Sequence, residues 1–211
     1  ADVLATLDPK TPLQEFAAVG LVGVTAYHGL QRLQLKPKER LAIMGAAGGV
    51  GQMAVAIAKS VGCHVIGVTH KKSQLGVLEE LGVDEIWDTS ERALKDHNPI
   101  DACLEMVGGA TFGHCVGLLK WGGRLCSIGA ITGGPAELSV WHLLNELTLT
   151  GWTSENLTRG ELQQAVELLQ KLIGSKQLQP PPFQERPMAE AARVHHEMEA
   201  GELFGRVLLV P

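Results

Sequence analysis

The feature that most constrains the fold is a cluster of small residues between an apolar run and a helical pattern. The cluster reads AAGGVG at 46–51; LAIMG precedes it at 41–45, and an Ala-rich segment follows it and ends at Gly62. A short apolar run has the composition of a buried strand, and a glycine after an Ala-rich segment is typical of a helix end. A second apolar run, HVIGVT, follows at 64–69. The order strand, tight turn, helix, strand is typical of a parallel sheet covered by helices.

The spacing within this cluster matches the fingerprint G-x-G-x-x-G, with Ala in the first place. The second position lacks a Cβ, so the backbone can approach a pyrophosphate, and the third lets the helix pack closely on the sheet. The start of the helix directs N–H groups and the positive end of its dipole toward the phosphates. We therefore expect a dinucleotide site; the alternative is a structural glycine turn in an unrelated α/β protein. The residues expected to hold the pyrophosphate are Ala46, Ala47, Gly48, Gly49, Val50 and Gly51.

Along the rest of the chain, apolar runs alternate with helical patterns. The runs are short and almost wholly apolar, as strands buried on both faces are, and right-handed crossovers between such strands give a doubly wound fold. The sequence therefore predicts an α/β protein with a doubly wound parallel Rossmann sheet. Expected strands cover 41–45, 64–69, 85–88, 102–107, 124–129 and 148–153, and expected helices cover 49–62, 72–82, 110–120 and 139–147.

Two flanking regions fall outside this repeat. Residues 17–35 have helical spacing and lead into the first strand. After a helix expected at 158–173, the segment QPPPFQERP contains four prolines, and we expect it to lack regular structure and to act as a linker. A helix at 188–200 and a strand, FGRVLLV, finish the chain. We therefore predict a dinucleotide-binding domain at 1–179 and a tail at 180–211 that belongs to an incomplete second domain.

The turn after the second strand indicates which cofactor is bound. Enzymes that use NAD usually carry an acid there, roughly 20 residues after the glycines, to bind the ribose hydroxyls. This chain has no acid between Glu39 and Glu79. Cationic side chains suit the 2′-phosphate of NADPH, and a bound anion would offset the unfavourable position of lysines at a helix start. The alternative is the solvated start of a helix. The residues of the expected phosphate site are Thr69, His70, Lys71 and Lys72.

Composition and motifs exclude several other classes of protein. The net charge of -5, without a basic cluster, argues against nucleic acid as a partner. No apolar run approaches the roughly 18 residues of a membrane span and the start lacks a secretory pattern, so we expect a cytoplasmic protein. The four cysteines form no C-x-x-C pair and no H-E-x-x-H occurs, so we expect buried thiols and no metal. The absence of a G-x-S-x-G elbow disfavours a hydrolase. The chain begins without Met, as a fragment or a processed chain does.

Further motifs occur in a fixed order: GVTAY, LKPKE, GAAGGVGQMA, LGVD, LLKWGGR and GELFGRVLLVP. Over nearly the whole chain they resemble the cofactor-binding portion of the medium-chain dehydrogenase/reductase superfamily, and in particular its zinc-independent quinone oxidoreductase and enoyl reductase branch. The resemblance implies that the N-terminal GroES-like catalytic domain is missing here, and that the tail from Phe183 returns to complete it. It also implies a zinc-free enzyme, because Leu21 stands where zinc-dependent relatives carry a ligand cysteine.

The same resemblance implies several contacts with the cofactor. Thr25 and Tyr27 would face the nicotinamide, and Tyr27 is a candidate catalytic residue, with packing of its helix as the alternative role. Val107 would lie at a ribose; many relatives carry Ser or Asn where this chain has Met106, so no side-chain hydrogen bond is expected there. The backbone groups expected to bind the carboxamide are those of Ile128, Gly129 and Ala130.

These observations predict an NADPH-dependent oxidoreductase that transfers hydride to a quinone or an activated carbon–carbon double bond, with the proton donor outside this chain or supplied by water. The alternative is an isolated NADPH-binding module, either a fragment or the reductase section of a larger synthase, without activity of its own. The glycine spacing disfavours a flavodoxin-like binder. The resemblance also implies a homodimer through an apolar edge strand at 148–152. The substrate is not determined by these residues.

Overall fold

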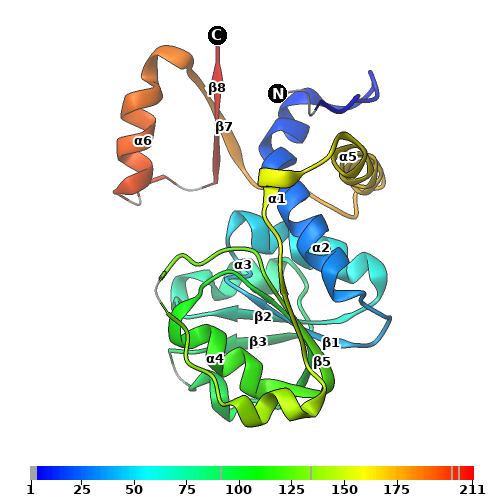
Figure 1. Cartoon of the computed structure of the whole chain (residues 1–211). Helices are drawn as coiled ribbons and strands as arrows, with labels where there is room; N and C mark the ends of the chain where they lie inside the picture. Colours follow the sequence, from blue (N-terminus) through cyan, green and yellow to red (C-terminus); the bar gives the residue numbers. More distant parts are fainter. Residues whose placement is uncertain (1–3, 91, 134, 201, 204) are drawn as a thin grey trace.

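A six-stranded sheet forms the centre of the computed structural model, which describes residues 4–90, 92–133, 135–200, 202–203 and 205–211. Every neighbouring pair of strands is parallel, and the order is β3-β2-β1-β4-β5-β6 (Figure 1). This arrangement confirms the predicted doubly wound parallel sheet. The strands are β1 (Arg40–Met44), β2 (His64–Thr69), β3 (Glu85–Asp88), β4 (Ile100–Glu105), β5 (Leu119–Ser127) and β6 (Thr148–Gly151).

Two hydrophobic clusters cover the two faces of this sheet. Leu41 and Ile43 of β1 belong to one cluster, whereas Ala42 and Met44 belong to the other. Successive side chains of a strand point to opposite faces, so a strand between two clusters must be apolar at every position. The first cluster includes residues of α1 (Leu13–Leu33), α2 (Gly49–Val61) and α5 (Arg159–Gly174), and the second includes residues of α4 (Gly109–Leu118).

Two of the expected helices differ from the prediction. The segment 139–147 forms only the 3-10 helix η3 (Val140–Asn145), which has no buried residue. Most of the stability of an α-helix in a protein comes from packing an apolar face, and η3 packs none. The helix expected at 72–82 divides into the 3-10 helix η1 (Lys72–Gln74) and α3 (Leu75–Glu80).

The tail forms a second sheet, so the prediction of an irregular linker holds for 179–182 and is wrong for 183–187. β7 (Phe183–Pro187) pairs in parallel with β8 (Arg206–Val210), and α6 (Ala191–Glu199) connects them. Proline is compatible with extended backbone, and Pro187 is the last residue of β7, where a ladder N–H is dispensable. The carbonyl of Pro182 accepts a hydrogen bond of 2.8 Å from the first N–H of β8. In Figure 1 this pair and α6 lie apart from the large sheet, beside the N-terminal part of α1. The division into two domains stays a prediction.

The structure also bears on the predicted cysteines, metal binding and membrane spans. All four cysteines are free and buried, which confirms the prediction of buried thiols. The described residues contain no group of three or more His, Cys, Asp or Glu side chains placed to hold a metal ion. Within the same part of the chain, no helix has both the length and the apolar character needed to cross a membrane.

Candidate cofactor site

The glycine turn connects β1 to α2 in very little space. Gly45 has a φ of 64°, a conformation that favours glycine, and its carbonyl accepts a hydrogen bond of 2.9 Å from the N–H of Gly48. A Cβ on Gly51 would lie 2.4 Å from that carbonyl oxygen and 2.6 Å from the Cα of Ala46. No side chain fits there without a shift of the backbone, so α2 packs directly on the end of β1. The sequence reasoning began the turn at Ala46 and missed Gly45.

The turn presents bare backbone at the N-terminus of α2. Gly48 is the N-cap and is exposed, Gly49 and Val50 are partly buried, and no side chain caps the helix. The first N–H groups of α2 are therefore available to an anion, which the helix dipole also favours. Ala46 is buried and its N–H donates to a carbonyl of β2 at 3.3 Å, so it shapes the turn. Ala47 is partly buried beside it.

The loops after β4 and β5 meet this turn at the carboxyl edge of the sheet. The strand order reverses between β1 and β4, and ligands of open α/β sheets bind at such a point. The side chain of Met106 lies 4.0 Å from the Cβ position of Gly45, and a Cβ on Gly108 would lie 3.0 Å from the Cβ of Ala130. The structure therefore brings to one edge four residues predicted to contact the cofactor: Val107, Ile128, Gly129 and Ala130.

The two predicted site residues of α1 differ in their surroundings. A Cβ on Gly29 would lie 2.8 Å from the side chain of Ile128, so α1 packs against the loop after β5. Thr25 lies one turn earlier on the same face, and its hydroxyl donates to a carbonyl of α1 at 2.9 Å. Tyr27 is partly buried, packs on the core and meets the ring of His28 edge-on at 4.8 Å. These contacts favour the packing role of Tyr27.

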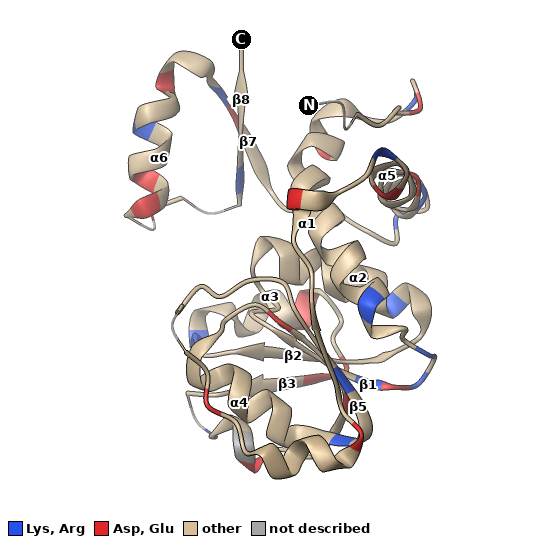
Figure 2. Ribbon diagram, viewed as in Figure 1, with Lys and Arg blue, Asp and Glu red and all other residues tan. Residues whose placement is uncertain are grey.

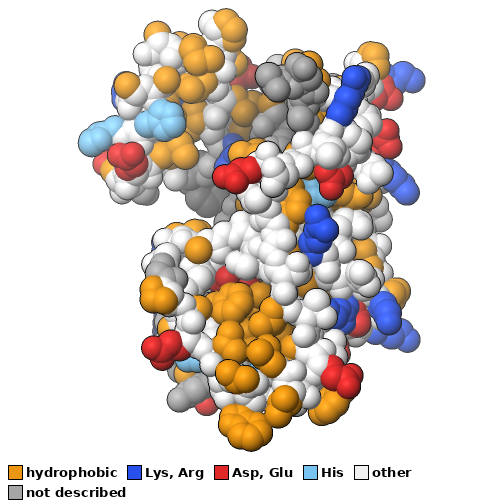
Figure 3. All heavy atoms as spheres, in the orientation of Figure 1, with side chains coloured by type: hydrophobic (Ala, Val, Ile, Leu, Met, Phe, Trp, Pro, Cys, Tyr) orange, Lys and Arg blue, Asp and Glu red, His pale blue; other side chains and the backbone are white. Residues whose placement is uncertain are grey.

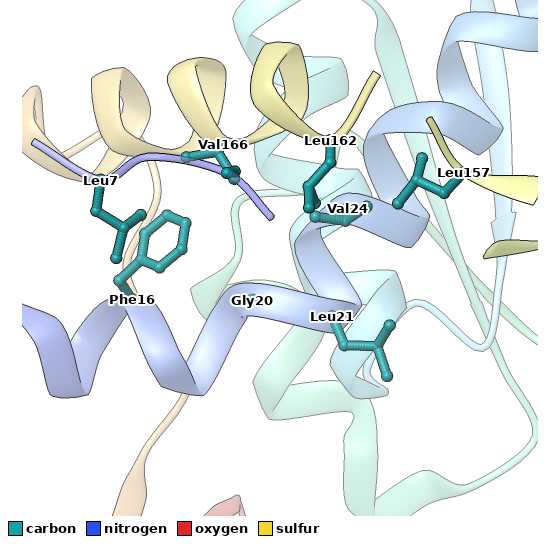
Figure 4. A pocket seen from close by; sticks show the side chains of 9 residues that line it. Leu7, Phe16, Gly20, Leu21, Val24, Leu157, Leu162 and Val166 are labelled. Atoms are coloured by element: carbon teal, nitrogen blue, oxygen red, sulfur yellow. The ribbon is translucent and has the colours of Figure 1, made fainter. Parts of the chain in front are cut away.

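An apolar cavity of about 290 Å³ lies between α1, α5 and the N-terminal segment (Figure 4). It includes Leu21 and Val24, which belong to the same turn of α1 as Thr25. Since the lining consists of apolar residues and glycine, the cavity suits a hydrocarbon group rather than a charged one. The lining residues are Ala5, Leu7, Phe16, Gly20, Leu21, Val24, Leu157, Leu162 and Val166.

The turn after β2 presents three polar side chains to solvent. His70, Lys71 and Lys72 are exposed at the carboxyl end of β2, beside the glycine turn in the sheet order. Thr69 is buried; its hydroxyl donates to Oε1 of Gln74 at 2.7 Å and accepts the N–H of Lys71 at 3.1 Å. The hydroxyl of Thr69 therefore holds the turn, whereas His70, Lys71 and Lys72 are exposed on it.

An acid from β3 lies beside this turn, and the sequence reasoning missed it. β2 and β3 pair with Thr69 opposite Asp88. Oδ1 of Asp88 accepts the N–H of Ser90 at 2.9 Å and its hydroxyl at 2.6 Å, whereas the buried Oδ2 has no hydrogen-bond partner in the described part of the chain. The bonds from Ser90 hold the pKa of Asp88 below its ordinary value, and the charge of Lys72 acts in the same direction. Only the pairing of the strands brings this acid to the site.

A second acid, Glu105, is fully buried at the end of β4. Its Oε1 accepts the N–H groups of Val107 and Gly108 at 2.7 and 2.9 Å and so holds the loop after β4. Its Oε2 is buried and makes no hydrogen bond with the residues that the structure describes. Burial raises the pKa of Glu105 above its ordinary value, although the two N–H donors favour the charged form. The sequence analysis did not include Glu105, although its signal, an acid within an apolar run, is present in the sequence.

A cation from the tail reaches the glycine turn. Nη1 of Arg206, the first residue of β8, lies 3.4 Å from the position of a Cβ on Gly49. A positive charge at the N-terminus of a helix is unfavourable unless an anion lies beside the charge and the helix end. The sequence reasoning assigned this strand to another domain, and for that reason it did not place Arg206 at the site.

Comparison with known families decides the relationship. The profile of the family described as zinc-binding dehydrogenase matches residues 49–171, which is more than half of the chain. The chain belongs to this family. It is a member of the medium-chain dehydrogenase/reductase superfamily, as the order of the sequence motifs predicted.

Three of the similar proteins are a reductase, a synthase and an oxidoreductase. Prostaglandin reductase-3 of Mus musculus is 36% identical over 134 residues, which cover 59% of this chain and 36% of that protein. Phthioceranic/hydroxyphthioceranic acid synthase of Mycobacterium tuberculosis is 26% identical over 221 residues, covering 99% of this chain and 10% of the synthase. The crystal structure of Escherichia coli quinone oxidoreductase complexed with NADPH has a TM-score of 0.83 and 26% identity, covering 98% of this chain and 68% of that one. The chain thus spans only part of each curated relative. The matching family is described as a dehydrogenase, and the crystal structure of the quinone oxidoreductase contains NADPH.

Proposed function

We propose that this chain is the cofactor-binding part of an NADPH-dependent oxidoreductase that transfers hydride to a quinone or an activated carbon–carbon double bond. The observation that carries the proposal is the glycine turn. The absence of a Cβ at Gly51 lets α2 pack on the end of β1, and with Gly48 as N-cap the first N–H groups of α2 have no side-chain cap. The names of two relatives, prostaglandin reductase and quinone oxidoreductase, support the class of reaction. The apolar cavity beside Thr25 supports a substrate with a hydrocarbon group.

Different segments of the chain would bind different parts of the cofactor. The start of α2 and Arg206 bind the pyrophosphate, and the exposed cations after β2 bind the 2′-phosphate. Val107 and the backbone of 128–130 orient the nicotinamide half. The bound NADPH supplies the hydride. The contribution of this chain is to hold the cofactor in one orientation with its nicotinamide end toward the substrate.

We propose that the reaction uses no zinc. Leu21 is an exposed apolar residue of α1 with no atom that ligates a metal, and it occupies the place of a ligand cysteine in zinc-dependent relatives. Metal analysis of the purified chain should find zinc far below one equivalent, and EDTA should leave NADPH binding unchanged. Stoichiometric zinc would contradict this part of the proposal.

The test of the proposed function is a titration of the chain with NADPH and with NADH. We expect both to bind, NADPH more tightly, and the double variant Lys71→Ala and Lys72→Ala to lose that preference because the 2′-phosphate loses its cations. Lys171→Ala with Lys176→Ala, at the distant end of α5, removes the same charge and should keep the preference. A chain that binds neither nucleotide would disprove the proposal.

A second candidate is an NADPH-binding module without activity of its own. The match to 10% of a large synthase favours this candidate, because the chain then corresponds to one section of a longer enzyme. Offering an enone or a quinone to the NADPH-loaded chain separates the two. Oxidation of NADPH supports the enzyme, and binding without oxidation supports the module.

We also propose that two copies of the chain associate through β6. β6 is the edge strand of the large sheet, and an uncovered edge favours pairing. The preceding η3 exposes Val140 and Trp141 to 71% and 78%, and Figure 3 shows hydrophobic side chains gathered on the lower part of the molecule. Light scattering should give about twice 22.5 kDa at micromolar concentration. Trp141→Asp, which places a charge on the exposed apolar surface of η3, should give a monomer; a monomeric wild type would contradict the proposal.

A further inference from the structure

The adenosine end of the proposed cofactor site carries charges of both signs. Lys71 and Lys72 are exposed after β2, and Asp88 ends the neighbouring strand β3 opposite Thr69. The N–H and the hydroxyl of Thr89 both donate to the carbonyl of Thr69, at 2.9 and 3.2 Å. The ends of β2 and β3 are therefore held together, and the carboxylate stays next to the turn that presents the lysines.

The two oxygens of Asp88 have different surroundings. Oδ1 accepts both hydrogen bonds from Ser90, and Oδ2 has none from the residues that the structure describes. Because Oδ2 is buried and Oδ1 is bonded to Ser90, the carboxylate acts on a bound nucleotide through its negative charge rather than through a hydrogen bond. A phosphate dianion bound beside this turn is repelled by the negative charge of Asp88. The 2′-hydroxyl of NADH carries no charge and escapes this repulsion, whereas the 2′-phosphate of NADPH does not.

We propose that Asp88 is a specificity-determining residue of the cofactor site, which lowers the preference for NADPH over NADH. The inference rests on the proposed function. The lysines after β2 attract the 2′-phosphate, and Asp88 opposes them from the adjacent strand. The chain would then accept both cofactors, although its sequence carries no acid in the usual place after the second strand.

The test is the variant Asp88→Asn, with the Kd of each cofactor measured by calorimetry. Asn keeps the shape of Asp and an oxygen for the two bonds from Ser90, and it removes the charge. The Kd of NADPH should fall about tenfold, an effect that shrinks at high salt, whereas that of NADH should change by less than about threefold. Asp96→Asn removes an exposed charge in η2 (Leu94–Asp96), before the amino end of β4, and should change neither Kd.

The outcomes separate this inference from the proposed function. If the wild type binds both cofactors and Asp88→Asn keeps the ratio of the two Kd values within about twofold, the inference is wrong and the proposed function stands. If the wild type binds neither, both are wrong. Circular dichroism shows whether the Asn variant folds, and Asp88→Ser removes the charge by a second route if it does not.

Discussion

The amino and carboxyl edges of the large sheet differ in how their charged groups are paired. At the amino edge, acids and bases form ion pairs with one another at distances of 2.5 to 3.1 Å. Figure 2 shows both types of charge near β1 and β5. These pairs tie the strands to one another and to the segments between them. They are Arg40–Glu85, Lys59–Asp84, Arg124–Glu39 and Lys120–Asp101.

At the carboxyl edge, several polar groups lack such partners. Buried oxygens of Asp88 and Glu105 make no hydrogen bond within the described part of the chain, and the first N–H groups of α2 have no side-chain cap. Arg206 stands in front of that helix end. Unpaired buried polar groups lower the stability of a fold. Of the four such side-chain atoms in the described residues, two lie at this edge, and the other two are the Nε2 atoms of His28 and His97. Together with the uncapped start of α2, the two carboxylate oxygens favour a ligand at the carboxyl edge.

The largest expected effect is that of Gly51→Ala, which fills the closest contact of the carboxyl edge. The new Cβ would lie 2.4 Å from a backbone oxygen, so the turn must open, and the free energy of unfolding should fall by about 1–3 kcal/mol. NADPH binding should be lost, because the turn sets the position of the uncapped start of α2. Gly76→Ala in α3, where a Cβ meets nothing within 4 Å, is the control and should not destabilise the chain. Chemical denaturation measures the free energy of unfolding, and calorimetry measures NADPH binding. Unchanged binding would contradict the role of the turn.

Replacing Glu105 tests the buried acid of the same edge. Glu105→Leu leaves two N–H groups without an acceptor, so the free energy of unfolding should fall by about 2 kcal/mol. Glu105→Gln keeps the acceptor and should stay within about 1 kcal/mol of the wild type. Because burial raises the pKa of this acid, its contribution is present at low pH and is lost as the pH rises through that pKa. The Gln variant should not show this loss, and equal pH profiles would argue against a buried, protonatable carboxyl.

Removing the cation at the start of α2 should have a smaller effect. Arg206→Gln should weaken NADPH and NADH equally, by about tenfold, because the pyrophosphate is common to both. Lys71 and Lys72 should affect NADPH alone, so the two sets of variants locate the two phosphate groups. Arg193→Gln, an exposed residue of α6 in the same tail, is the matched control. If Arg206→Gln lowered only the melting temperature, the residue would be structural.

The sequence predicted the large sheet well because the information was local. A strand buried on both faces must be apolar throughout, and a helix on such a sheet shows its own period, so the six strands and most helices followed from short windows. The tail was the exception. The prolines suggested an irregular linker, but β7 forms because it pairs with β8, almost at the other end of the tail. In η3, four apolar residues predicted an α-helix, but none of the residues of this 3-10 helix is buried.

In the candidate site, too, short stretches of sequence predicted a local motif but not the contacts between distant segments. The glycine turn is a local motif, and its geometry follows from the spacing of Gly48 and Gly51. Asp88 and Arg206 reach the site through the pairing of β3 with β2 and the packing of β8 beside α1, which no short window records. A prediction that considers the neighbours of each strand end, and not only the residues that follow it, would have included Asp88.

The smallest expected effect concerns the amino edge, where pairing is nearly complete. The guanidinium of Arg40, assisted by His64 and Trp87, lowers the pKa of Glu85 from 4.5 to about 2. A depressed pKa stabilises the fold above the ordinary value, and this contribution is lost as the pH falls from 4.5 toward about 2. Partial exposure and salt limit it to about 1 kcal/mol, so Glu85→Gln should differ from the wild type at pH 7 and approach it in acid. Glu190→Gln, from a pair in the tail, is the control. A constant difference between the Glu85→Gln variant and the wild type down to about pH 3 would mean that the amino edge is held by packing rather than by charge.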